Sequence, residues 1–278
     1  MDNTQRFSNR VDNYVKYRPG YPRDVLHFLS EIKGFNAHWT VADIGSGTGI
    51  STSLFLDNGN TVYAVEPNAP MRGKAEELLG SRAGFISIDG TAENTTLQPA
   101  SIDLIIAGQA FHWFNPLPTK KEFTRILRPG GAIALMWNER QKSSDFEKAY
   151  EDLLQTYGTD YKNVNHSNIT EKEIAAFFQP DPVQPPPVQS SPFQPPPVQS
   201  SSVQSSPFQP PSFQLKVADN RQTFDWERLK GRLLSSSYIP LEPADTYNKM
   251  IRDLKNIFET YQQNGFVYFD YQTKVYIA

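Results

Sequence analysis

The first 140 residues alternate short apolar runs with segments whose apolar residues recur at helical spacing. The expected elements are, in chain order, a strand at 40–44, a helix at 51–56, a strand at 61–66, a helix at 70–79, strands at 84–88 and 102–107, a helix at 119–127 and a strand at 132–137. Strands that alternate with helices are typical of a doubly wound α/β fold with a parallel sheet. In such sheets the carboxyl ends of the strands form the ligand crevice.

The residues after 140 are predicted to be mainly helical. Two capping-box patterns, at 144–147 and 170–173, indicate helix starts. A longer helix is expected from about Asp245, with Gly265 as its C-terminal cap. Its apolar face would contain Met250, Leu254, Ile257, Phe258 and Tyr261. Residues 266–278 then predict an antiparallel strand pair with a short turn between the strands.

Residues 180–214 depart from this pattern and form a low-complexity insert. Twelve of the 22 prolines lie here, and a glutamine preceded by Val or Phe recurs every five residues from Gln179 to Gln214. Because proline donates no backbone hydrogen bond, a pentapeptide β-helix is excluded and a disordered, semi-extended segment is expected. Two Pro-x-x-Pro matches, at 192–195 and 207–210, are the kind that SH3-like domains bind. A weak contact with such a domain is therefore the alternative to an expanded low-complexity segment without a function.

Composition narrows the function classes. With 27 Lys+Arg against 30 Asp+Glu, the formal net charge of −3 gives no electrostatic reason to expect nucleic acid or acidic lipid as a partner. The absence of cysteine excludes disulfides, thiol nucleophiles and Cys-ligated metals, and no metal site is predicted. No apolar run approaches the length of a membrane span or a signal sequence, so a cytoplasmic protein is expected.

Three glycines, at 45, 47 and 49, directly follow the first predicted strand. Bare backbone at such a turn lets a ligand approach closely, and the next helix directs N–H groups at its negative end. Glu66 ends the second strand, where its carboxylate can accept both hydroxyls of a ribose, and Asp43 favours an ammonium over a pyrophosphate. The G-x-G-x-G spacing also differs from that of dinucleotide folds. A ligand with an adenosine, an ammonium and a carboxylate fits, as S-adenosylmethionine does.

The successive motifs resemble those of class I S-adenosylmethionine-dependent methyltransferases over about residues 7–140. They are Val41–Gly49, Val65–Asn68 with Met71, Gly90–Glu93, Ile102–Ile105 and Arg125–Gly131. Four further segments resemble the small-molecule branch of the type 11 methyltransferase domain family, which includes trans-aconitate methyltransferases. They are Arg18–Pro22, Gln109–Phe114, Trp137–Arg140 and Gly231–Tyr238. The resemblance implies a seven-stranded, mostly parallel Rossmann-like sheet whose last two strands are the C-terminal pair, the last inserted antiparallel.

The resemblance also implies the contacts of the cofactor, position by position. Gly45, Ser46 and Gly47 would line its methionine part, Glu66 its ribose, Pro67 and Met71 the faces of its adenine, Thr91, Ala92 and Glu93 the adenine edge, and Gly108 and Gln109 the sulfonium. From the glycine turn itself, Gly49 joins the predicted cofactor contacts, and Asp43 could bind the ammonium directly or through water. Thr91 stands where many relatives have Asp, which leaves a backbone contact to the adenine amine as the alternative to a charged one.

On the acceptor side, a carboxylate needs no general base, whereas a phenol, alcohol or amine is helped by one. His112 and Tyr14 are the candidate catalytic residues, and His112 could instead cap a helix or contact substrate. Arg18, on the helical face of Tyr14, could bind the cofactor's carboxylate or an acidic substrate. Candidate acceptor contacts are Tyr17, Trp113, Arg140, Arg232 and Tyr238.

The sequence therefore predicts a methyltransferase that transfers a methyl group to a carboxylate or hydroxyl oxygen of a small molecule. A quinone or lipid-like ring as acceptor, and a non-catalytic scaffold that docks partners through the insert, are the alternatives. A monomer or homodimer is expected. The predicted divisions are an N-terminal lid at 1–36, a cofactor-binding core at 37–142, a helical cap at 143–179 and 215–265, the insert at 180–214 and a C-terminal strand pair at 266–278.

Overall fold

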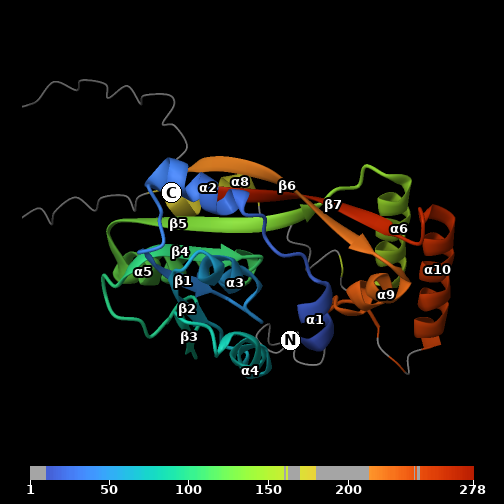
Figure 1. The fold of residues 1–278 in the computed structure, drawn as a ribbon, viewed down its shortest axis with the longest axis horizontal. Helices are drawn as coiled ribbons and strands as arrows, with labels where there is room; N and C mark the ends of the chain where they lie inside the picture. Colours follow the sequence, from blue (N-terminus) through green and yellow to red (C-terminus); the bar gives the residue numbers. More distant parts are fainter. Residues whose placement is uncertain (1–10, 160, 162–169, 180–212, 241, 243–244) are drawn as a thin grey trace, which may run out of the picture.

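A seven-stranded sheet with helices on both faces organises the protein (Figure 1). The computed structural model describes residues 11–159, 161, 170–179, 213–240, 242 and 245–278. The Pro-x-x-Pro matches of the insert lie outside these residues, as does the beginning of the predicted lid. No helix in the described ranges is long and apolar enough to cross a membrane.

The elements have the following bounds. The strands are β1 (Thr40–Ile44), β2 (Thr61–Val65), β3 (Phe85–Ile88), β4 (Ile102–Gly108), β5 (Leu127–Arg140), β6 (Gln214–Phe224) and β7 (Val267–Ile277). The helices are α1 (Val11–Tyr17), α2 (Asp24–Lys33), α3 (Ile50–Asp57), α4 (Ala69–Leu79), α5 (Pro116–Ile126), α6 (Asp145–Tyr157), α8 (Glu171–Phe178), α9 (Trp226–Leu234) and α10 (Asp245–Tyr261). A 3-10 turn, η2, covers Phe111–Trp113.

The strand order is β3-β2-β1-β4-β5-β7-β6. Strands β1 to β5 are parallel, and β7 is inserted antiparallel between β5 and β6. The order reverses between β1 and β4, which is where open α/β sheets place their ligand crevice. The predicted doubly wound, mostly parallel sheet of seven strands is confirmed.

The predicted C-terminal strand pair is wrong. Residues 267–277 form one continuous strand, whose side chains alternate between buried and more exposed positions from Val267 to Val275. The remaining strand of the sheet is β6, in a range that was predicted to be helical cap. It pairs with β7 along its whole length, from Gln214 opposite Ile277 to Phe224 opposite Val267.

Three predicted boundaries also differ. Helix α5 begins at Pro116, and β5 already begins at Leu127, where the register with β4 shifts between Ile102 and Leu104. Gly265 does not cap α10, which ends at Tyr261. Its left-handed backbone, with φ of 85°, instead forms the turn that leads into β7. Both predicted capping boxes, which open α6 and α8, are confirmed.

Two apolar layers cover the sheet, and a third cluster forms the cap. Helices α2 and α3 bury apolar side chains such as Leu29 and Phe55 on one face, and α5 and α8 bury others such as Phe123 and Phe177 on the opposite face. Helices α6, α9 and α10 pack together with the far ends of β6 and β7 (Figure 1). Helix α1 connects the two parts, since Asp12 forms an ion pair with Lys74 of α4 at 3.2 Å and Tyr17 lies against α9.

The residues that flank the insert lie close together. The rings of Phe178 and Phe213 have centroids 5.7 Å apart, and both pack against the α5–α8 face of the sheet. A short linker can therefore connect them. We expect replacement of 182–211 by a four-residue Gly-Ser linker to leave the melting temperature and the affinity for S-adenosylhomocysteine unchanged, as measured by calorimetry. A large loss of affinity would assign the insert a part in cofactor binding.

Candidate functional site

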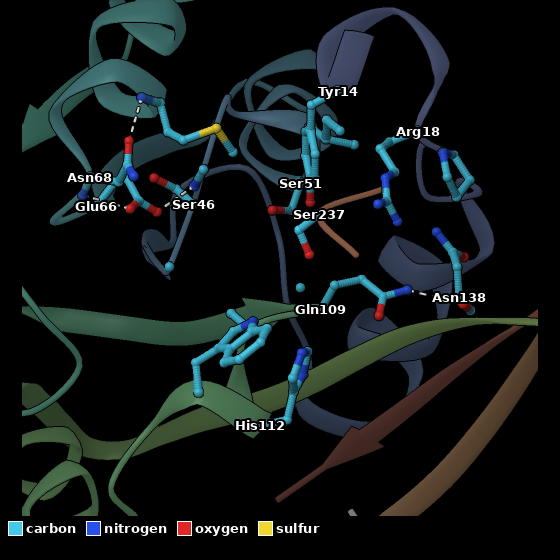
Figure 2. Close-up of a pocket in the computed structure, with 18 of the residues that line it drawn as sticks. Tyr14, Arg18, Ser46, Ser51, Glu66, Asn68, Gln109, His112, Asn138 and Ser237 are labelled. Atoms are coloured by element: carbon cyan, nitrogen blue, oxygen red, sulfur yellow. Dashed lines mark hydrogen bonds between the residues drawn. The ribbon is translucent and has the colours of Figure 1, made fainter. Parts of the chain in front are cut away.

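A cavity of about 510 Å³ opens at the carboxyl ends of the parallel strands (Figure 2). Helix α1 supplies one wall, and the chain after α9 supplies another. The cavity brings together residues that the sequence analysis placed in one site: Tyr14, Arg18, Gly45, Ser46, Gly47, Glu66, Pro67, Met71, Thr91, Ala92, Glu93, Gly108, Gln109, His112, Trp113, Arg140, Arg232 and Tyr238. Glu66 and Ser46 lie at one end of the view and Arg18 at the other, with Gln109 and His112 between.

The glycine turn after β1 depends on backbone that only glycine adopts readily. Gly45 and Gly47 have φ of 68° and 58°. A Cβ on Gly45 would lie 2.7 Å from the Cβ of Ala110, so the turn also fits closely against the loop after β4. The N–H of Gly47 donates a hydrogen bond of 2.9 Å to Oε2 of Glu66. The turn and the end of β2 are thereby held together at the floor of the cavity.

Glu66 is buried, with 8% of its surface exposed. Its Oε1 accepts a hydrogen bond of 2.8 Å from the N–H of Asn68, in addition to the bond from Gly47 to Oε2. Burial raises the pKa of Glu66, against the two backbone hydrogen bonds, which lower it. Because a carboxylate oxygen accepts two hydrogen bonds, both oxygens can still accept a ribose hydroxyl from the cavity side.

Asp43 lies beneath the turn and does not line the cavity. Its side chain is fully buried, and Oδ2 accepts hydrogen bonds from the hydroxyls of Ser51 at 2.7 Å and Thr52 at 2.6 Å. Ser51 does line the cavity, so a cation there would meet Asp43 through this hydroxyl. Of the two predicted ways in which Asp43 could meet an ammonium, directly or through water, the structure favours an indirect one, because the start of α3 covers the carboxylate.

Burial raises the pKa of Asp43 to about 6, although its hydrogen bonds with Thr52 and Ser51 lower it. A carboxyl whose pKa is raised by folding destabilises the fold when ionised, so the penalty grows from about pH 4 to pH 6 and is complete above that. We expect Asp43→Asn to raise the free energy of unfolding at pH 7.5 by about 1–3 kcal/mol, and the gain to vanish near pH 4. Urea unfolding at both pH values tests this, and a pH-independent effect would contradict it.

The predicted adenine contacts surround the cavity next to Glu66. Met71 lies in the first turn of α4, and Oδ1 of the N-cap residue Asn68 accepts a hydrogen bond of 3.0 Å from the N–H of Met71. Thr91, Ala92 and Glu93, in the loop after β3, also line the cavity. The carboxylate of Glu93 accepts a hydrogen bond of 2.8 Å from the N–H of Asn115, so this side chain is already used to position the loop before α5.

The loop after β4 occupies the middle of the cavity. Gln109 has a left-handed backbone with φ of 56°, and its Nε2 donates to the carbonyl of Asn138 at 3.0 Å. A Cβ on Gly108 would lie 2.7 Å from the hydroxyl of Tyr21, which shows how closely the N-terminal segment approaches this loop. His112 and Trp113 follow on η2, with ring centroids 4.6 Å apart, and both line the cavity.

Two arginines line the acceptor side of the cavity. Arg18 donates to the carbonyl of Ser235 at 3.2 Å and lies 5.0 Å from the ring centroid of Tyr14. Arg232 is 7% exposed and donates to the hydroxyl of Ser236 at 3.4 Å. Neither guanidinium forms an ion pair with a carboxylate of the described residues, and the Nε of each is buried without a partner there. Burial, and next the charge of Arg232, lowers the pKa of Arg18.

Arg140 differs from these two arginines because it is already neutralised. It forms an ion pair with Glu151 and lies 4.9 Å from the ring centroid of Tyr150. Lys142 and Tyr161 also donate to the Glu151 carboxylate, each at 2.8 Å. Arg140 therefore reaches the cavity as a side chain held by α6.

Two predicted contacts lie outside the cavity. The ring of Tyr17 packs against α9, where a Cβ on Gly231 would lie 2.0 Å from it. Gly49 begins α3, and a Cβ there would lie 2.4 Å from Leu79. Neither residue lines the cavity, because both are used in packing between helices. The contacts of Tyr17 with the acceptor and of Gly49 with the cofactor stay predictions.

Sequence reasoning missed several residues that line the cavity, among them Tyr21, Asn68 and Asn138. Asn138 is 3% exposed, and its Nδ2 donates to the carbonyl of Gly20 at 3.0 Å while its Oδ1 accepts from Thr273. Tyr21 and Asn138 belong to the motifs Arg18–Pro22 and Trp137–Arg140, so their membership of these motifs was the available signal.

Comparisons with known proteins agree with this geometry. The methyltransferase domain family matches residues 42–135. An uncharacterized methyltransferase of Mycobacterium tuberculosis is 33% identical over 141 residues, which are 51% of this chain and 55% of the relative. The chain thus spans about half the length of this relative. An uncharacterized methyltransferase of Geobacillus kaustophilus is 34% identical over 156 residues, which are 52% of this chain and 71% of the relative.

Solved structures share the fold. A chain from Anaeromyxobacter dehalogenans, named for a type II methyltransferase, superimposes with a TM-score of 0.58 at 19% identity. The superposition covers 94% of this chain and 97% of the Anaeromyxobacter chain. A chain from Anabaena variabilis, named for a methyltransferase, gives a TM-score of 0.57 at 16% identity, with 94% and 98% covered. Together with the family match and the glycine turn opposite Glu66, these similarities show that the chain belongs to the class I S-adenosylmethionine-dependent methyltransferase family.

Proposed function

We propose that the protein transfers the methyl group of S-adenosylmethionine to an oxygen of a small, carboxylate-bearing molecule. The observation that carries the proposal is the hydrogen bond between the glycine turn and Glu66 at one end of a cavity whose other end holds Arg18 and Arg232. The cavity thus has an acidic end suited to a ribose and a basic end suited to an anion.

The residues present fit the cofactor. Glu66 keeps acceptor capacity toward the cavity, and the turn presents bare backbone there, since a Cβ on Gly47 would lie 3.3 Å from Cε of Met71. Gly45, Ser46 and Gly47 would hold the amino-acid part, Glu66 the ribose, and Pro67, Met71 and the loop at 91–93 the adenine. When bound, the cofactor supplies an activated methyl group, and the chain's own residues orient the acceptor and exclude water.

Alignment of the acceptor is the chief contribution that we assign to this chain. Holding two reactants in line contributes about 7–11 kcal/mol to a rate enhancement. Arg18 and Arg232 would fix one carboxylate, with Tyr14 and Tyr238 beside them, while Trp113 and His112 border the space toward Gln109. A carboxylate acceptor is ionised at pH 7 and needs no proton transfer, whereas a hydroxyl acceptor would use His112 as its base.

Two measurements on the full chain test this proposal. Calorimetric titration with S-adenosylhomocysteine is expected to show one micromolar site, and the absence of any binding to the folded wild type would overturn the cofactor assignment. A screen with tritiated methyl donor then compares aliphatic di- and tricarboxylic acids with quinones and phenols. Methylation of the ring compounds alone would favour the lipid-like acceptor over the carboxylate.

A further inference from the structure

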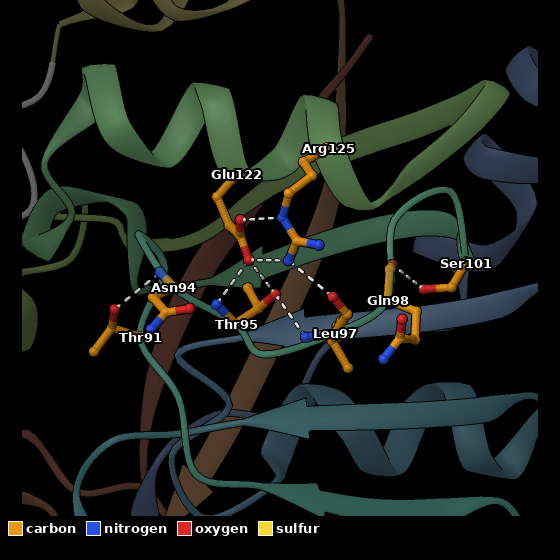
Figure 3. Close-up of polar contacts among 8 residues, drawn as sticks. All are labelled: Thr91, Asn94, Thr95, Leu97, Gln98, Ser101, Glu122 and Arg125. Carbon is orange, nitrogen blue, oxygen red and sulfur yellow. Dashed lines mark hydrogen bonds and ion pairs between the residues drawn. The ribbon is translucent and has the colours of Figure 1, made fainter.

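A polar cluster outside the cavity connects α5 with the loop after β3 (Figure 3). Glu122 of α5 is 8% exposed, and its Oε1 accepts hydrogen bonds from the N–H of Thr95 at 2.8 Å and from its hydroxyl at 2.5 Å. Arg125, one turn further along α5, donates to both oxygens of Glu122 at 2.7 Å. Neither Glu122 nor Thr95 lines the cavity.

The cluster is ionic and tightly hydrogen-bonded. Arg125, followed by the hydrogen bonds from Thr95, lowers the pKa of Glu122 to about 2, so the carboxylate is charged throughout the physiological range. Arg125 also donates to the carbonyl of Leu97 at 2.8 Å. Helix α5 thus holds the loop backbone at two points, Thr95 and Leu97.

The other end of the same loop forms the cavity wall. Thr91 and Asn94 exchange backbone hydrogen bonds of 3.1 and 3.3 Å, which close a compact turn. A Cβ on Gly90 would lie 3.0 Å from the carbonyl oxygen of Thr95, so the turn folds directly onto the residue that Glu122 holds. A displacement of Thr95 would therefore move the turn that carries Thr91 and Ala92.

We propose that Glu122 and Thr95 position the 91–93 turn for recognition of the adenine edge, and so determine which purine the site accepts. The proposal rests on the proposed function, because it requires that an adenine binds against this turn. The side chain of Thr91 carries no charge, so backbone groups of the turn supply the recognition. Backbone groups recognise a purine edge only where the turn is held in place, and Glu122 holds it from α5.

The experiment compares two ligands that differ only at the purine edge, S-adenosylhomocysteine and S-inosylhomocysteine. We expect Glu122→Gln and Thr95→Val to weaken binding of the adenosyl ligand by roughly 3–10-fold, the equivalent of one hydrogen bond. The ratio of the affinities for the adenosyl and inosyl ligands should fall as well. Thr95→Ser keeps the hydroxyl and is expected to retain the wild-type preference.

The matched control is Ile126→Val, which shortens a fully buried apolar side chain of the same helix and removes none of the cluster's hydrogen bonds. It lowers the melting temperature through lost packing, and is expected to leave both affinities unchanged. If Glu122→Gln lowers the melting temperature as Ile126→Val does and keeps the wild-type preference, the positioning role is overturned. If the wild type binds neither ligand, the proposed function itself fails, which is a distinguishable result.

Discussion

Replacing Glu66 by alanine is expected to weaken binding of S-adenosylhomocysteine by roughly 10–150-fold, because a charge-assisted hydrogen bond is worth about 1.5–3 kcal/mol. The carboxylate also accepts the N–H groups of Gly47 and Asn68, at 2.9 and 2.8 Å. Alanine would leave both amides without this acceptor, so the glycine turn loses its fixed position together with the ribose contact. Calorimetric titration of the purified variant measures the loss.

Glu66→Gln separates the two effects. Its side-chain oxygen can accept one of the two backbone N–H groups, but its amide would face the other donor, so an intermediate loss of affinity is expected. The control is Glu76→Ala on α4, since Glu76 is exposed, accepts the hydroxyl of Ser87 and does not line the cavity. Wild-type affinity in Glu66→Ala would remove Glu66 from the site.

The parallel half of the fold was predictable because its signals are local. Strand β1 is an apolar run that is buried on both faces, and the glycines and Glu66 follow their strands at fixed spacing. Strand β6 offers no such run, because it is an edge strand with alternating polar residues and a mostly exposed or half-buried pattern. Its pairing is set by β7, which lies more than 40 residues later in the sequence.

Strand β7 shows the same dependence on distant residues. Asp270 and Gln272 suggest a turn, but the chain stays extended there. The N–H of Asp270 donates to the carboxylate of Glu147 in α6 at 3.0 Å, and Arg221 of β6 donates to the carboxylate of Asp270. Within the site, the same reason explains Asn138, whose contacts come from Gly20 and Thr273, far apart in the sequence. Local patterns predict where a ligand binds, whereas such long-range contacts determine how its acceptor side is built.

Replacing Arg232 by methionine is expected to abolish the thermal stabilisation of the protein by carboxylates, without lowering the stability of the free protein. Arg232 is buried, forms no ion pair with a described carboxylate and shares the cavity with Arg18. A buried charge without an opposite partner costs free energy, and an apolar side chain of similar length removes that cost. A bound carboxylate would supply the missing charge, which is why the wild type should gain stability from it.

Thermal unfolding with acetate, malonate and citrate at constant ionic strength measures this gain. The wild type should be stabilised most by the ligand that fits both arginines, by about 2.7 kcal/mol at a hundredfold excess over its dissociation constant. Arg232→Met should lose the gain and, for an identified acceptor, raise KM by roughly 10–150-fold with the cofactor affinity unchanged. The control for nonspecific effects of the added anions on surface charges is Arg221→Met, because Arg221 is exposed and paired with Asp270.

The two outcomes distinguish a binding arginine from a structural one. If Arg232 serves only to pack α9, its replacement lowers the melting temperature, and the remaining response to carboxylates is that of the wild type. If Arg232 binds the acceptor, the free protein is at least as stable as the wild type, and the response disappears. Stability and ligand response then change in opposite directions, which is the expected signature of a charge kept in the fold for binding.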